Sequence, residues 1–167
     1  HGYVLTPINE FMSQMKELGM KTKFMGTYWS SSELMYMKAK EVCDGYMGTM
    51  HLNYFNMEKS PGKEWDAMKA YHDRVHPDKK GRPSFYMFGW FQTMVWAEVI
   101  ERTIDAGKPL TDENLRATLN SIKDWDTGGI ASVPVTVRKN SIPFGRIFKI
   151  NAAEGKYEPV SEVIEIK

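Results

Sequence analysis

The chain has 167 residues, of which 42% are hydrophobic and 26% are charged, and its formal net charge is +1 at pH 7. This length fits one domain, or two only if both are small, and the composition is that of a globular protein. The low net charge, with Lys and Arg scattered along the chain, argues against a nucleic-acid partner and against an electrostatic membrane anchor. No apolar stretch approaches the roughly 20 residues that a membrane-spanning helix needs.

The first 50 residues alternate between strand and helix patterns. Ile8, Met12 and Met15 recur at helical spacing, and Gly19 is placed to end that helix. In chain order the pattern predicts a strand end over residues 2–5, a helix over 6–18, a strand over 21–25, a helix over 30–43 and a strand over 46–50. This alternation predicts a parallel sheet with covering helices.

The middle of the chain is predicted to be helical, and its end is predicted to be β. After a connector over residues 52–63, the predicted helices cover residues 64–75, 85–106 and 111–122. Gly107 is placed to end the longest helix, and Thr111 to cap the next one. The pattern then alternates as in a strand over residues 133–137, and further strands are predicted over 146–150 and 157–166.

This order of α/β, helical and β segments is not expected of a single doubly wound sheet. Two lobes joined by chain crossings would produce it, with crossings at residues 50–56 and 123–129. The second crossing contains Asp126, Thr127, Gly128 and Gly129. Asp and Thr side chains hydrogen-bond nearby backbone, and glycine adopts positive φ at little cost, so a turn is predicted there.

No arrangement of catalytic residues stands out. The sequence has no dinucleotide or phosphate-binding glycine motif and no Gly-x-Ser-x-Gly, so we expect neither an enzyme activity nor a cofactor. His72 and His76 lie four residues apart on a predicted helix, but the residues between them lack the glutamate of a zinc motif. They are interpreted as surface histidines, and no metal site is expected. Cys43, the single cysteine, is interpreted as a small buried apolar residue.

Aromatic residues make up 13% of the chain and point to a ligand-binding site. In parallel α/β sheets, ligands bind outside the carboxyl ends of the strands. The longest predicted helix would also offer free backbone N–H groups to an anion at its first turn. The candidate ligand-binding residues are therefore Tyr3, Val4, Tyr28, Trp29, Ser30 and Phe85. Packing in a core remains open as the alternative role of Tyr28 and Trp29.

Several short segments follow one another in a characteristic order. They are residues 16–21 (KELGMK), 24–26 (FMG), 44–48 (DGYMG), 89–90 (GW), 97–102 (AEVIER), 123–129 (KDWDTGG), 134–135 (PV), 145–147 (GRI) and 155–161 (GKYEPVS). In this order and spacing they resemble the C-terminal half of the branched-chain-amino-acid-type solute-binding proteins of ABC importers. No single motif is highly specific, so the resemblance rests on their succession along essentially the whole chain.

The resemblance implies an α/β fold of the type I periplasmic-binding-protein kind, with two lobes of parallel sheets flanked by helices, of which only the C-terminal half is present. Residues 1–50 then belong to the second lobe, residues 51–124 supply mainly helices of the first lobe, and residues 125–167 form a crossing and the terminal β segment of the second lobe. The missing N-terminal half is implied as a partner. The hinge residues are implied to be Met50, His51, Asp126, Gly128 and Gly129.

The implied function is that of the extracytoplasmic solute-binding component of an ABC transporter. Two hinged lobes close on a small solute, and the closed form docks on the membrane permease subunits without doing chemistry. The implied location is periplasmic or extracytoplasmic, with a signal peptide expected on the missing N-terminal part.

The resemblance also bears on the solute. In the amino-acid-binding members, an acidic residue after the FMG strand meets the ligand ammonium, and Tyr28 stands at the matching position here. Val4, beside Tyr3, and Phe85 match two aromatic positions of those members. A buried ammonium without a counter-charge is costly, so an aromatic or aliphatic carboxylate, or another neutral or anionic solute, is favoured over a free α-amino acid. Glu33 is the other acid considered for reaching the ammonium.

Two other classes of function are weighed against this one. A ligand-sensing domain of a receptor or transcriptional regulator would use the same fold. A flavodoxin-like enzyme would share the α/β pattern, but the absence of a phosphate motif and the β-rich end of the chain speak against it.

Overall fold

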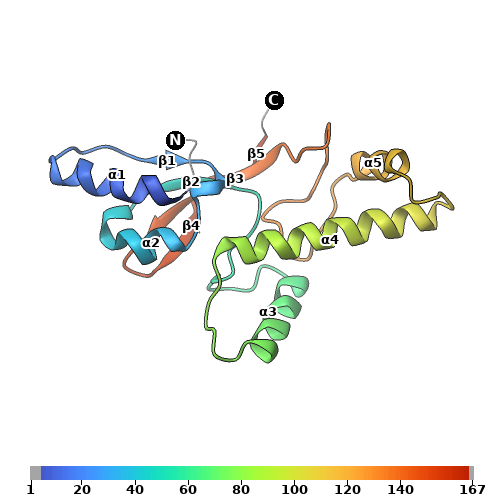
Figure 1. Ribbon diagram of the computed structural model, residues 1–167, viewed down its shortest axis with the longest axis horizontal. Helices are drawn as coiled ribbons and strands as arrows, with labels where there is room; N and C mark the ends of the chain where they lie inside the picture. The colour runs from blue at the N-terminus through green and yellow to red at the C-terminus, as the bar shows by residue number, and fades with distance from the viewer. Residues whose placement is uncertain (1–4, 166–167) are drawn as a thin grey trace.

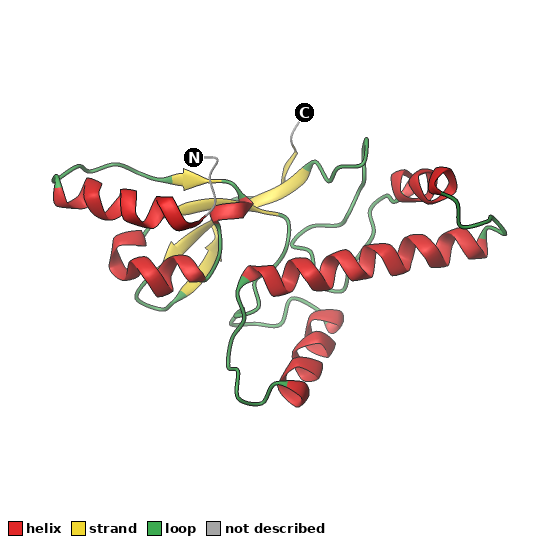
Figure 2. Cartoon of the chain, viewed as in Figure 1, coloured by secondary structure: helices red, strands yellow, loops and turns green. Residues whose placement is uncertain are grey.

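The structure is a computed structural model that describes residues 5–165 and is of the mixed α/β class (Figure 2). The α-helices are α1 (Leu5–Glu17), α2 (Leu34–Ala39), α3 (Lys63–Val75), α4 (Ser84–Asp105) and α5 (Asp112–Ser121). Two 3-10 helices are η1 (Tyr28–Ser30) and η2 (Lys40–Cys43). The strands are β1 (Met25–Gly26), β2 (Met47–Met50), β3 (Phe144–Asn151), β4 (Lys156–Pro159) and β5 (Ile164–Glu165).

The sheet joins the two ends of the chain. Its strand order is β1-β2-β3-β4, and β5 pairs with β3. β1 and β2 are parallel, as predicted, whereas the pairs β2–β3, β3–β4 and β3–β5 are antiparallel. The parallel pairing predicted within the first 50 residues is therefore present, and the C-terminal strands extend it into a mixed sheet. The short link between β3 and β4 explains their antiparallel pairing, because a parallel pair needs a crossover of a dozen or more residues.

One face of this sheet is buried under α1 and α2. Along β2 and β3, Gly48, Met50 and Phe148 are buried, whereas Met47 and Lys149 point to the other face and are less covered. Period-two alternation of this kind is expected when one face of a sheet packs on helices and the other does not. The buried apolar residues of α1 and α2 that belong to this core are Ile8, Met12, Met35 and Ala39.

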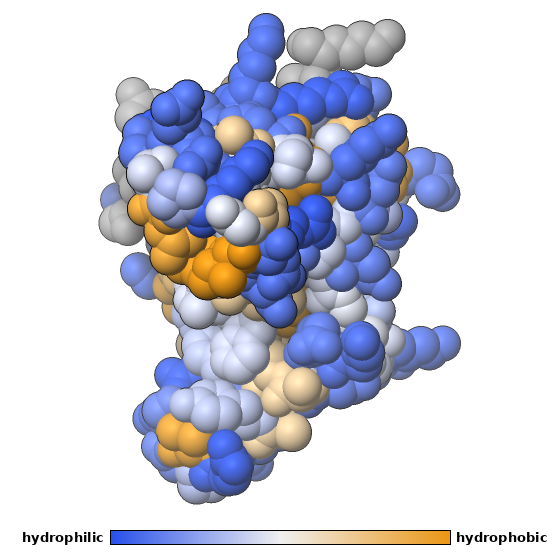
Figure 3. Space-filling view, turned by 90° about the vertical axis from the view of Figure 1, so that its right-hand side faces the viewer, coloured by the Kyte–Doolittle hydropathy of each residue, from blue (hydrophilic) through white to orange (hydrophobic). Residues whose placement is uncertain are grey.

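The helices α3, α4 and α5 form a second part of the molecule beside the sheet (Figure 1). α4 packs on α5, where the buried Thr103 hydroxyl donates to Thr118 Oγ1 at 2.9 Å. Other apolar side chains of α4 are exposed, including Trp96 at 55% and Ile104 at 57%. In the view from the α5 end, apolar surface is visible among hydrophilic side chains (Figure 3). Among the described helices, none combines the length and apolar character that crossing a membrane requires.

Two chain crossings connect the parts and run side by side. Leu52 and Ala131 form an antiparallel bridge. The Ser132 N–H donates to the His51 carbonyl at 2.8 Å, and the Asn53 N–H donates to the Ile130 carbonyl at 3.0 Å. The polar backbone of both segments is thereby satisfied where they leave the sheet.

The predicted helix ends are confirmed at three positions. Gly19 and Gly107 have φ of +73° and +67°, and each lies in a hydrogen-bonded helix C-terminus. Thr111 caps α5, since its side chain accepts a hydrogen bond from the Asn114 N–H at 3.3 Å.

Several predicted elements are shorter or absent. The strand over residues 21–25 is reduced to β1, the helix over 30–43 is divided among η1, α2 and η2, and the strand over 157–166 is divided between β4 and β5. Residues 133–137 form no ladder, only an isolated bridge between Val135 and Trp125. Pro134 has no N–H to donate, and Thr136 is buried like its valine neighbours, so the alternation does not separate two faces. Leu5 begins α1, and the rest of the predicted strand end at residues 2–5 lies outside the described residues.

The Asp-Thr-Gly-Gly turn is a closely packed corner. Gly128 and Gly129 have φ of +59° and +92°. The Gly128 carbonyl accepts hydrogen bonds from the N–H groups of Glu64 and Trp65, at 3.0 and 3.2 Å, in the first turn of α3. A Cβ atom on Gly129 would lie 2.5 Å from the Gly62 nitrogen, so both positions require glycine for conformation and for space.

We expect Gly129→Ala to lower the free energy of unfolding by about 2–4 kcal/mol, because a side chain there combines a left-handed backbone with overlap against neighbouring backbone atoms. Gly89→Ala is the matched control, because Gly89 lies inside α4 with nothing within 4 Å of its added Cβ. That variant should gain about 0.5–1 kcal/mol from helix propensity. Urea unfolding of both variants tests the comparison, and equal stabilities would contradict the close packing described for the corner.

Candidate ligand-binding site

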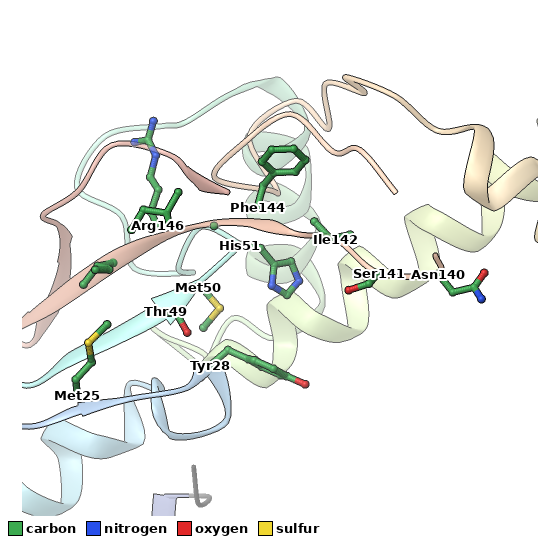
Figure 4. Close-up of a pocket in the computed structure, with 13 residues that line it drawn as sticks. Met25, Tyr28, Thr49, Met50, His51, Asn140, Ser141, Ile142, Phe144 and Arg146 are labelled. Carbon is green, nitrogen blue, oxygen red and sulfur yellow. The ribbon is translucent and has the colours of Figure 1, made fainter. Parts of the chain in front are cut away.

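A hollow of about 590 Å³ lies where the parallel strands β1 and β2 end. Tyr28 and His51 follow these two strands and meet the segment that leads into β3 (Figure 4). This is the end of a parallel pair at which α/β proteins bind ligands. The lining residues are Met25, Tyr28, Thr49, Met50, His51, Asn140, Ser141, Ile142, Phe144, Gly145, Arg146, Ile147 and Ile164.

Aromatic rings from three segments converge beside this hollow. The centroid of the Tyr28 ring lies 6.2 Å from that of His51 and 5.6 Å from that of Phe88. The His51 ring lies 5.8 Å from Phe88 and 5.6 Å from Phe91 on α4. The tilted and edge-on arrangements are those that aromatic pairs favour, so the cluster is a packed wall that joins the sheet end to α4.

The predicted ligand-binding residues take different places around this wall. Tyr28 lines the hollow, and the half-exposed Trp29 lies 5.0 Å from it. Phe85 is exposed at the start of α4 and reaches the wall only through Phe88, at 6.4 Å. The predictions at Tyr3 and Val4 fall outside the described residues.

Ser30 does not line the hollow and is corrected to a structural role. Its side chain is fully buried, and its hydroxyl lies 3.0 Å from the Thr27 carbonyl and 2.7 Å from the Tyr46 hydroxyl. A polar group this deeply buried needs such partners, and they leave Ser30 committed to the core. The sequence pattern gave no sign that η1 would turn this side chain inward.

The first turn of α4 is occupied by a carboxylate of this chain. Glu33 is 3% exposed, and its Oε2 accepts a hydrogen bond from the Ser84 N–H at 2.6 Å. The expectation that this helix start offers free N–H groups to an anionic ligand is therefore wrong for the Ser84 N–H, because Glu33 already complements the positive end of the helix. Among the described residues, neither Glu33 Oε1 nor Ser84 Oγ has a hydrogen-bond partner.

Burial raises the pKa of Glu33 from 4.5 to about 7. Hydrogen bonds from backbone groups of Glu33, Ser84 and Phe55 lower this pKa but do not offset the loss of hydration. Glu33 is absent from the residues that line the hollow. The idea that it reaches a ligand ammonium from there is therefore not supported by its position.

His51 is placed at the hollow although the sequence interpretation gave it only a hinge role. Burial lowers its pKa from 6.5 to about 4, so the imidazole is neutral at pH 7. Ile142, Phe144 and Arg146 were also not predicted as site residues. No local pattern marks them, because they reach the site only through the pairing of β3 with β2.

His72 and Cys43, the other residues considered for metal binding or reactivity, have structural roles. His72 is fully buried, with Nδ1 2.9 Å from Asp73 Oδ1 and with Nε2 accepting from Arg82 Nε at 2.9 Å, so its interpretation as a surface histidine is wrong. Sequence spacing gave no warning, because Phe55 and Tyr86 cover the ring from other segments. Cys43 is buried, as predicted, and burial raises the pKa of its thiol to about 11. Within residues 5–165, no group of three His, Cys, Asp or Glu side chains is arranged to hold a metal ion.

No protein-family model and no curated protein matches the sequence, whereas solved structures do match the fold. A branched-chain amino acid ABC transporter protein from Thermus thermophilus with bound valine aligns with 97% of this chain and 44% of its own, with TM-score 0.75 and 18% identity. A fatty acid ABC transporter substrate-binding protein from Thermomonospora curvata aligns over 98% and 42%, with TM-score 0.74 and 17% identity. A type 1 periplasmic binding protein from Bordetella pertussis aligns over 95% and 45%, with TM-score 0.62 and 18% identity.

These comparisons confirm the predicted fold. The chain has the fold of type I periplasmic binding proteins and spans less than half the length of the structures that it matches, which is consistent with the C-terminal half of that fold. Two of these neighbours are described as ABC transporter proteins and the third as a periplasmic binding protein.

Glu33→Gln tests the buried carboxylate. A folded pKa of about 7 against an ordinary 4.5 means that the favourable contribution of this group to stability is fully present below about pH 4.5. It is lost as the pH rises through 7, by about 3 kcal/mol in the free energy of unfolding. Gln keeps an acceptor for the Ser84 N–H without a charge, so its stability should vary less between pH 5 and pH 8.

Urea unfolding at pH 5 and pH 8 measures the difference. Glu101→Gln, an exposed carboxylate on α4, is the control and should keep the wild-type pH dependence. A Glu33→Gln variant whose stability changes with pH as much as that of the wild type would show that Glu33 is not the group that titrates.

Proposed function

We propose that this chain is the C-terminal part of the solute-binding component of an ABC importer. The observation that carries the proposal is the hollow at the ends of β1 and β2, lined by Tyr28 and His51, in a chain with the type I binding-protein fold. Phe88 packs on both of these rings. In this proposal the protein works outside the cytoplasm, closes on a small solute and delivers it to membrane permease subunits.

The two parts of the molecule are proposed to belong to different lobes. Residues 1–50 and 125–167 would form most of the second lobe and residues 51–124 helices of the first. Met50, His51, Asp126, Gly128 and Gly129 would lie at the crossings about which the lobes hinge. The exposed apolar side chains of α4 support a first lobe completed by the other half of the fold, because Trp96, Ile100 and Ile104 would otherwise stay in water.

The solute is proposed to be neutral or anionic, with aromatic or aliphatic carboxylates as the leading class. Arg146 is the one charged side chain among the described residues that line the hollow, and no carboxylate lines it. A buried ammonium would lack a counter-charge there. The valine bound to the Thermus thermophilus neighbour points the other way, toward an amino acid, but at 18% identity that likeness extends to the fold alone.

Isothermal titration of the full-length natural protein with leucine, valine, benzoate and a medium-chain fatty acid tests the proposal. Micromolar or tighter binding of a carboxylate without an amine supports it. Tight binding of leucine or valine would keep the solute-binding role and overturn the proposed solute class. Absence of binding to every member of the panel would count against the solute-binding role itself.

Tyr28→Leu is expected to weaken binding of the best ligand by about tenfold, because it removes an aromatic wall of the hollow while leaving an apolar side chain. Tyr71→Leu is the control, since Tyr71 is a half-exposed aromatic of α3 that does not line the hollow. Titration calorimetry on both variants decides the point, and similar losses in both would remove Tyr28 from the site.

A further inference from the structure

The His51 imidazole is a polar group in apolar surroundings. Its ring contacts Tyr28, Phe88 and Phe91. It also borders the hollow, beside Tyr28 (Figure 4). Among residues 5–165, neither ring nitrogen has a hydrogen bond or an ion pair. The Ser132 N–H bonds the His51 carbonyl and not its ring.

His72 is a fully buried histidine that does not line the hollow, and its hydrogen bonds can be compared with those of His51. Both ring nitrogens of His72 have partners, Asp73 on one side and Arg82 on the other. A buried polar group without a partner costs free energy, so fully enclosed ones are normally satisfied. Neither ring nitrogen of His51 is among the buried side-chain atoms without a partner, so both remain accessible at the hollow, where a solute would meet them.

A neutral imidazole offers one N–H donor and one acceptor nitrogen. When a solute covers the ring, it removes the water that would otherwise satisfy these atoms. A solute that carries a hydroxyl group can replace the water, whereas one with a methyl group of similar size leaves the nitrogen unpaired. The flat ring of Tyr28 lines the hollow and favours a flat, ring-containing solute beside it.

We propose that His51 is a ligand-contacting specificity residue, whose neutral imidazole hydrogen-bonds a hydroxyl group carried by the ring of an aromatic solute. This inference rests on the proposed solute-binding function and narrows its solute class. It also gives His51 a contact role in addition to its place at a crossing.

The test compares two ligands that differ only at the group His51 would recognise, 4-hydroxybenzoate and 4-methylbenzoate. The wild-type full-length protein should bind the hydroxyl compound at least about tenfold more tightly, which corresponds to one hydrogen bond of about 1.4 kcal/mol. His51→Phe keeps a ring and removes both nitrogens, so the two affinities should come within about twofold of each other. His51→Gln restores a donor and an acceptor and should recover part of the preference.

Phe88→Leu is the matched control for packing. It should weaken both ligands by a similar factor and leave their ratio unchanged, because Phe88 packs on the rings of Tyr28 and His51 and carries no polar group. Thermal unfolding checks that each variant is folded, and His51→Leu replaces His51→Phe if the latter is not.

An unchanged preference in His51→Phe, or no preference in the wild type, would overturn the inference and leave the solute-binding function standing. The same holds if leucine binds and neither aromatic compound does. Failure of all three compounds to bind the wild type would overturn the inference through the function on which it rests.

Discussion

A buried carboxylate ties the loop between η1 and α2 to the start of the long helix, and the aromatic contact between Tyr28 and Phe88 forms beside it. Glu33 follows the loop that carries Tyr28, and its side chain holds the first N–H of α4, the helix that carries Phe88. Loss of hydration makes this carboxylate costly to keep charged, so it is a weak source of net stability. Its effect is geometric, because the hydrogen bond places the start of α4 beside the loop that carries Tyr28.

Tyr54 and Tyr157 connect the loop before α2 to other elements of the core. The Trp65 indole on α3 donates to the Tyr54 carbonyl at 3.1 Å, and the Tyr54 hydroxyl donates to the Ser31 carbonyl at 3.2 Å. The Tyr54 ring stacks on Tyr157 of β4 at 4.3 Å. Segments far apart in the sequence therefore share one core. The loop over residues 27–33 is hydrogen-bonded to Tyr54, to α4 and to β4, and Tyr54 in turn connects it to α3.

The glycine corner shows how one motif supports two interpretations. From the sequence, Gly128 and Gly129 are flexible residues at a crossing, and that supports their proposed place near a hinge. In the structure they are close-packed, since the Gly128 carbonyl holds the first turn of α3 and Gly129 touches residue Gly62. The corner and α3 are therefore held as one unit, so bending at this crossing would carry α3 along with it.

Local signals in the sequence determined the helices α1, α3, α4 and α5, the glycines that end α1 and α4, the cap at Thr111, the burial of Cys43 and the position of Tyr28 after a strand. Each of these depends on a few neighbouring residues. Only the tertiary structure decided that β3 pairs antiparallel with β2 and that Ser30, His72 and Glu33 are buried. It also decided that the rings of His51 and Phe88 pack against each other. Pairing of strands and burial of polar groups depend on contacts with other segments of the chain, and no periodicity within one segment records which partner it will meet.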